Sequence, residues 1–132
     1  MHQSVLLIIA GIIGSTVTYS LQKAGLNAIL SSAIVGLFAG FLGQYTSHSN
    51  VAAALFCGSF VGMTSINLMP IMAVAIAGGT SGFIYYYTQS LFKGFGGKLG
   101  TIAFISVGFT FILLLFSKKN IAKLGKLLNN KQ

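Results

Sequence analysis

A long uncharged stretch constrains this sequence more than any motif within it. Residues 51–92 contain no Asp, Glu, Lys or Arg over 42 positions. A soluble domain carries roughly a quarter charged residues, whereas this chain is 6% charged and 55% hydrophobic. A larger core cannot account for the missing charge, because a small domain still exposes much of its surface. The sequence therefore predicts a surface covered by lipid, and its length predicts a single domain.

Apolar runs and the breaks between them predict an all-α, polytopic integral membrane bundle of about five short, glycine-rich transmembrane helices. These helices are expected at residues 5–21, 27–45, 51–66, 70–91 and 99–116. A hydrocarbon layer of about 30 Å needs roughly 20 helical residues. The third helix is short by this measure, so four spans plus one re-entrant helix is the alternative. Asn27 is expected to cap the second helix, and Pro70 to lie in the first turn of the fourth.

Two segments, residues 33–46 and 75–88, match each other at a spacing of 42 positions. Each contains a Gly-x-x-x-Gly motif followed by a tyrosine, namely Gly36, Gly40 and Tyr45 in the first and Gly78, Gly82 and Tyr87 in the second. This spacing places both glycines on one helix face, where a neighbouring backbone can approach closely. The match predicts a two-helix internal repeat, with chance similarity in a Gly-, Ala- and Ile-rich sequence as the alternative.

The charges are all lysines, and five of the eight fall within the last fifteen residues. Because cytoplasmic loops collect Lys and Arg, five spans place Lys23 and the tail lysines inside and Lys93 and Lys98 outside. The four-span version moves Lys23 outside but keeps the tail inside. We therefore expect a multi-pass protein of the inner or plasma membrane with a cytoplasmic C-terminus.

Residues 117–132 are predicted to form a basic amphipathic cytoplasmic tail beyond the bundle of residues 1–116. In a helix, Ile121, Leu124, Leu127 and Leu128 fall on one side, and Lys118, Lys119, Lys123 and Lys126 fall on the other. Such a helix suits the anionic inner leaflet, and a solvated, frayed tail is the alternative. We expect no nucleic-acid partner, because the body of the chain has no solvated basic face.

Four tyrosines are predicted to anchor helix ends at the lipid headgroups: Tyr45, Tyr85, Tyr86 and Tyr87. Tyrosine prefers this level because its ring is apolar and its hydroxyl reaches water. Three consecutive tyrosines point around more than half of a helix, so at least one of them faces protein.

We expect no enzyme, metal site or cofactor. Without an acid there is no Ser-His-Asp set, and carboxylate-based proton or cation sites would need a partner subunit. His2 and His48 form no metal-binding pattern. Cys57 is expected well inside the membrane, away from His48, as a small buried apolar residue. Residues 94–100 lack the spacing of a phosphate-binding loop.

The leading functional hypothesis is a small channel or transporter-like protein for a neutral or anionic solute, acting as an oligomer. Its candidate path residues are Gly36, Gly40, Gly78, Gly79, Thr80 and Ser81. Adjacent glycines loosen a helix and expose carbonyls beside the two hydroxyls. Plain helix packing, with the hydroxyls bonded to their own helix, is the alternative interpretation of the same residues.

Two other function classes remain open from the sequence. One is a non-catalytic accessory or assembly subunit that docks other membrane helices through its glycine faces. The other is a holin-like pore former, which the small size and basic tail favour and five spans disfavour. Partners are accordingly expected to be lipids together with copies of the chain or other membrane subunits.

Overall fold

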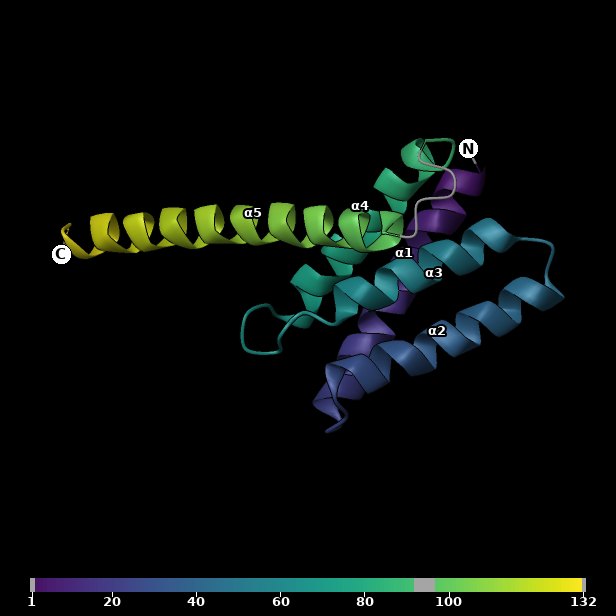
Figure 1. Ribbon diagram of the computed structural model, residues 1–132. Coiled ribbons are helices and arrows are strands. Elements are labelled where there is room, and N and C mark those ends of the chain that lie inside the picture. The colour runs from purple at the N-terminus through teal and green to yellow at the C-terminus, as the bar shows by residue number, and fades with distance from the viewer. Residues whose placement is uncertain (1, 92–96, 132) are drawn as a thin grey trace.

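The structure, a computed structural model, describes residues 2–91 and 97–131. Within these ranges the chain forms five α-helices and no strand (Figure 1), and the helices are α1 (His2–Lys23), α2 (Ala28–Tyr45), α3 (Ser49–Gly62), α4 (Ile71–Thr88) and α5 (Lys98–Asn129). The prediction of an all-α fold with about five helices is confirmed. Among the described helices, α1, α2 and α5 are long and apolar enough to cross a membrane.

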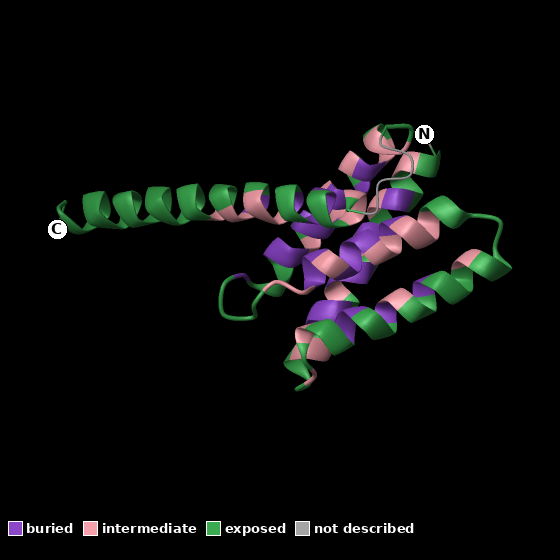
Figure 2. Ribbon diagram, viewed as in Figure 1, coloured by how far each residue is buried: buried purple, intermediate pink, exposed green. Residues whose placement is uncertain are grey.

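The shortest helix, α3, lies at the centre of the bundle. It contacts each of the other four helices, and none of its residues from Val51 to Gly62 is exposed. Buried and half-buried residues accordingly cover most of its length in Figure 2. Its 14 residues correspond to about 21 Å at the helical rise per residue. The core is therefore built around a helix that is shorter than a bilayer is thick.

Helix α1 packs against both α3 and α4, and these two interfaces are the most extensive in the bundle. Helix α2 runs antiparallel beside α3 (Figure 1) and also contacts α1. Within the described residues it contacts neither α4 nor α5. One face of α2 is therefore packed on the bundle, and the rest of the helix lies at the periphery.

Helix α5 contacts only α3 and α4 within the described part of the chain. It does so through its first half, whose buried residues are Ile102, Ala103, Ser106 and Thr110. Every residue from Leu115 to Lys131 is exposed, and this half projects away from the bundle (Figures 1 and 2). The helix continues through residue 116, where the sequence predicts the end of a span, because residues 109–124 contain neither Gly nor Pro.

Three predicted details of the helix ends are wrong. Asn27 stands at the N-cap of α2 but its side chain makes no capping hydrogen bond. Helix α3 ends at Gly62, four residues early, because the N–H groups of Met63 and Thr64 turn back to carbonyls three residues before them. Pro70 precedes α4 as its N-cap instead of lying in the first turn.

The loops between helices are short where the structure describes them. Gly25 lies between α1 and α2 with a φ of 110°, a conformation that glycine adopts without steric cost. Of the glycine-rich loop that the sequence predicts at residues 93–100, residues 93–96, including Lys93, fall outside the described residues, and residues 98–100 belong to α5.

Unlike a water-soluble domain, the protein exposes many large apolar side chains and buries many hydroxyl side chains. Large apolar side chains cover the outside: Leu37 is 77% exposed and Phe104 79% exposed. The buried positions include eight hydroxyl residues, namely Ser15, Thr18, Ser31, Ser32, Ser59, Ser81, Ser106 and Thr110. Exposed apolar surface on this scale marks a surface that another apolar phase or partner covers.

Tyr19 of α1 forms a hydrogen bond with the loop between α3 and α4. Its side chain is 2% exposed, and its hydroxyl donates to the carbonyl oxygen of Met69 at 2.7 Å. Three residues later, the Gln22 side-chain amide donates to the carbonyl of Gly62 at 2.5 Å. The C-terminal end of α1 therefore supplies the donors that the carbonyls around the loop require.

Replacing Tyr19 by Phe tests this role. Tyr19→Phe should lower the free energy of unfolding by about 1–3 kcal/mol, because the Met69 carbonyl remains buried without its donor. Unfolding of the purified protein by SDS in mild-detergent micelles, followed by circular dichroism, measures the change. The matched control is Tyr45→Phe, at a side chain that is 79% exposed. Equal effects of the two substitutions would contradict the assignment.

Candidate functional site

Three glycines from three helices meet at the centre of the bundle, and we call Gly11, Gly58 and Gly78 the glycine junction. A Cβ atom added at Gly58 of α3 would overlap the carbonyl oxygen of Gly11. A Cβ atom added at Gly11 would in turn overlap the carbonyl oxygen of Gly78 of α4. The backbones of α3 and α4 therefore touch the same residue of α1, which is possible only without side chains at these positions.

The close approach extends in both directions from the junction. Between α1 and α4, a Cβ atom at Gly82 would overlap the carbonyl oxygen of Leu7. Between α1 and α3, a Cβ atom at Gly14 would overlap the carbonyl oxygen of Leu55. At Gly62 the nearest neighbours are the backbone of Ser15 and the side chain of Thr18. These contacts fill the space between the three helices with backbone.

Most buried hydroxyls along these helices bond to their own helix. Ser15 donates to Ile12 at 3.0 Å, Ser81 to Gly78 at 2.7 Å and Ser106 to Ile102 at 2.7 Å. The hydroxyls of Ser32 in α2 and Ser59 in α3 form a hydrogen bond between helices, at 3.1 Å. Thr18 Oγ1 is the one buried side-chain oxygen of the described residues that has no hydrogen-bond partner. The interior thus contains polar groups that need no water.

The structure divides the six path residues predicted from the sequence into two separate groups. Gly78 is buried at the interface with α1, and the position of a Cβ at Gly79 is in contact with the Ile12 side chain. Ser81 is buried and donates to Gly78, and Thr80 donates to Ile76, both within α4. Gly36 and Gly40 lie on α2, which does not touch α4 in the described part of the chain. The two groups therefore line no common space.

The glycine face of α2 is open. The Phe56 ring covers Gly36, whereas no atom lies within 4 Å of the position of a Cβ at Gly40. A groove of about 520 Å³ runs along this face. It is lined by Ala33, Gly36, Leu37, Gly40, Phe41, Gln44 and Phe56. We call it the α2 groove.

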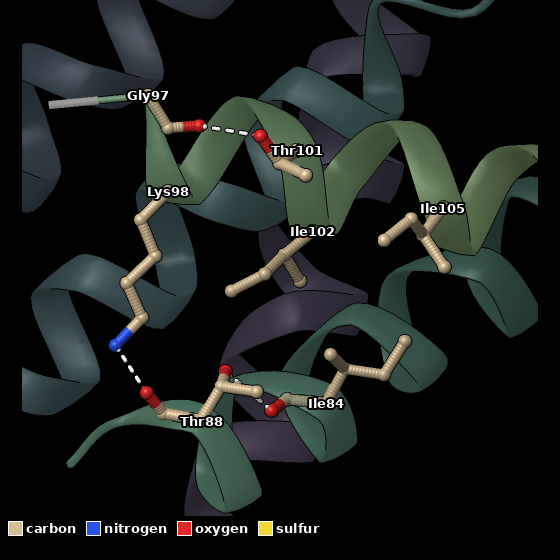
Figure 3. Close-up of a pocket in the computed structure, with 7 residues that line it drawn as sticks. All are labelled: Ile84, Thr88, Gly97, Lys98, Thr101, Ile102 and Ile105. Atoms are coloured by element: carbon tan, nitrogen blue, oxygen red, sulfur yellow. Dashed lines mark hydrogen bonds between the residues drawn. The ribbon is translucent and has the colours of Figure 1, made fainter. Parts of the chain in front are cut away.

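A second hollow, of about 370 Å³, lies where α5 begins beside the end of α4. Figure 3 shows the Lys98 side chain reaching from α5 to the C-terminal end of α4. Lys98 Nζ donates to the carbonyl oxygens of Thr88 and Leu91, the latter at 2.9 Å. It also lies 5.4 Å from the centre of the Tyr85 ring. A cation at this position stabilises the negative end of the α4 dipole, so Lys98 serves the fold here.

The four predicted anchor tyrosines occupy different environments. Tyr45 and Tyr87 are 79% and 64% exposed, and Tyr86 is half-buried. Tyr85 is 8% exposed beneath Lys98 and packs inside the protein. It is the member of the consecutive set that faces protein.

The thiol and imidazole groups form no reactive cluster. Cys57 is fully buried in α3, and its Sγ lies 3.4 Å from the carbonyl oxygen of Leu99. His48 is exposed just before α3. Among the described residues, no group of three or more His, Cys, Asp and Glu side chains is placed to hold a metal ion. The sequence did not predict the roles of Lys98, Tyr19 and Gln22. Each donates a hydrogen bond to a backbone carbonyl of another segment, and no sequence motif marks such a contact.

Comparisons of the chain with protein-family models, with curated proteins and with solved structures find no match. The functional assignment therefore depends on the geometry of the two glycine faces.

The matched glycines of the two motifs provide a direct test of backbone contact. Gly82→Ala should lower the free energy of unfolding by about 1–3 kcal/mol, because the methyl group overlaps a backbone carbonyl that cannot yield. Gly40→Ala, at the equivalent position of the first motif, should raise it by about 0.5–1 kcal/mol through helix propensity alone. SDS unfolding in micelles measures both. Two changes of the same sign and size would contradict this packing.

Proposed function

We propose that the chain is an integral membrane protein with a cytoplasmic C-terminus and serves as a non-catalytic assembly subunit that docks other membrane helices along α2. The membrane location is supported by the polarity of the bundle. Its outer surface is apolar, all but one of its buried hydroxyls are bonded internally, and three of its described helices are long and apolar enough to cross a membrane. In lipid, backbone and hydroxyl groups have to be satisfied within the protein in this way.

The length of α3 favours the arrangement in which it does not span on its own. At about 21 Å it is shorter than a hydrocarbon layer of about 30 Å. Short or irregular segments are tolerated at membrane depth where protein surrounds them, and α3 contacts all four other helices. The basic tail lies on the cytoplasmic side in both the five-span and the four-span versions.

The open α2 groove is the main support for the proposed docking function. Within one protomer, the Gly78/Gly82 face is already occupied by the backbone of α1, whereas Gly40 of the matching motif faces open space. Small residues in membrane helices allow close backbone approach and interhelical packing. The α2 groove therefore suits a helix from another copy or from a different membrane subunit.

A transport function for a neutral or anionic solute is the second candidate, and the buried hydroxyls favour it. Ser32 and Ser59 form a polar contact between helices, and Thr18 leaves one buried oxygen unbonded. The glycine junction closes the space between α1, α3 and α4 with backbone, so a path would have to run between protomers. Solute influx into liposomes that contain the purified protein, above that of empty liposomes, would favour this candidate over the assembly function.

Filling the α2 groove tests the proposed docking function. Gly40→Leu should reduce the assembled fraction at least about tenfold, because a side chain at a close helix contact costs more than about 1.4 kcal/mol. Size-exclusion chromatography with light scattering in mild detergent, combined with mass spectrometry of co-purified subunits, reports the assembly.

The matched control is Gly100→Leu, at an exposed glycine of α5 with open space around it. This variant should assemble like the wild type. An unchanged assembly in Gly40→Leu, or an equal loss in both variants, would refute docking through α2.

A further inference from the structure

The second half of α5 forms an arm without any contact to the bundle, and we call residues 115–131 the C-terminal arm. All of its residues are exposed, and it stands away from the other helices in Figure 1. It remains helical to Asn129 although no tertiary contact supports it. An isolated helix of this length is marginal in water, so a surface that covers the arm would stabilise it.

The two sides of the C-terminal arm differ in chemistry. At 100° per residue, the large apolar side chains beyond Lys118 share one face, and all of them are more than 60% exposed: Ile121, Leu124, Leu127 and Leu128. The opposite face carries Lys118, Lys119, Lys123 and Lys126. An apolar stripe beside a row of lysines is the pattern of a helix that lies in a membrane interface.

The absence of acids from the chain determines the charge of the partner. The sequence contains no Asp or Glu, so neither this chain nor a second copy can neutralise the lysines with side-chain carboxylates. The counter-anions therefore come from a different molecule. A nucleic acid would pair with the lysines but would leave the apolar stripe in water, whereas anionic lipid matches both faces.

The position of the arm along α5 agrees with this partner. Helix α5 has 32 residues, which correspond to about 48 Å and exceed a hydrocarbon layer of about 30 Å. Its uninterrupted apolar run ends at Phe116, and the first lysine is Lys118. If the first half of α5 lies in the hydrocarbon layer, the arm begins where the headgroups are.

We propose that the C-terminal arm docks on the surface of the bilayer by binding anionic lipid headgroups through its lysines while its leucine face enters the acyl boundary. On docking, α5 bends between Phe116 and Lys118, because a straight helix cannot both cross the hydrocarbon layer and lie along its surface. This inference rests on the membrane location in the proposed function but not on docking through α2. It assigns a lipid preference to a segment that contacts no part of the protein. Each lysine near an anionic surface strengthens such binding about fivefold.

The test uses the full-length chain in lipid nanodiscs. Because the sequence contains no Trp, Leu124→Trp introduces a single tryptophan as the reporter on the leucine face. In discs that contain phosphatidylglycerol, its emission should shift to the blue and resist quenching by iodide. In discs of phosphatidylcholine alone, the emission should remain that of a water-exposed indole. High salt should weaken the shift, because it screens exposed charges.

Two variants in the reporter background separate charge from hydrophobic burial. Changing Lys118, Lys119, Lys123 and Lys126 to Gln should lower the docked-to-free ratio in anionic discs at least about tenfold. Changing the same four residues to Arg retains the charge and should retain the shift. The variants should leave the bundle intact, since these side chains are exposed on the half of α5 that projects away from the other helices (Figure 1).

Three results would overturn the inference. The first is equal emission in both lipid compositions, and the second is a four-Gln variant that behaves like the wild type. The third is a larger blue shift in phosphatidylcholine discs with added single-stranded RNA than in discs that contain phosphatidylglycerol. Failure of the chain to incorporate into any disc would instead refute the membrane location. Incorporation without a lipid-dependent shift refutes only the role of the arm.

Discussion

The contact of three helix backbones at Gly11 is the constraint on which the rest of the bundle depends. The backbone of α3 contacts Gly11 at Gly58, and the backbone of α4 contacts Gly11 at Gly78. Without side chains, the helices come close enough for dispersion forces between backbones to act over a long interface. This is the kind of attraction that remains available in lipid, where burying apolar side chains gains little. The position of α3 in the centre follows from it.

The polar groups of the chain are arranged to satisfy one another around that contact. Buried serines bond to their own helices, and Ser32 and Ser59 link α2 to α3. Donors from distant segments reach the carbonyls at the helix ends: Tyr19 bonds to Met69, and Lys98 to Thr88. The protein can therefore place its large apolar side chains outward. The α2 groove and the C-terminal arm are among the described surfaces that this arrangement leaves without a packing partner.

The helices and their order could be predicted from the sequence because apolar runs and their breaks are local signals. The central position of α3 could not, since its short apolar run is the signature of a weak span, and its burial depends on glycines of α1. The continuity of α5 through residue 116 was visible only as a lack of helix breakers. The side chains change from apolar to basic near residue 116, but the backbone remains helical.

The candidate site was predicted in part. The Gly-x-x-x-Gly motifs were identified, but identical motifs in α2 and α4 have different environments because only α4 lies opposite the backbone of α1. Sequence similarity therefore grouped Gly36 and Gly40 with Gly78 to Ser81, which the fold separates. Lys98 gave no signal as a partner for α4, because its acceptors are carbonyls whose position depends on the loop between α4 and α5.

The central claim is that lipid covers the outside of this bundle while α3 is shielded at its centre. Photolabelling with a lipid-soluble diazirine in reconstituted membranes, with the labelled residues mapped by mass spectrometry, tests it most directly. The account predicts strong labelling at Leu37 of α2 and Phe104 of α5 and almost none at the fully buried Ala54, Cys57 and Val61 of α3. Labelling of α3 as strong as that of α2 and α5, or none at Leu37 and Phe104, would contradict it.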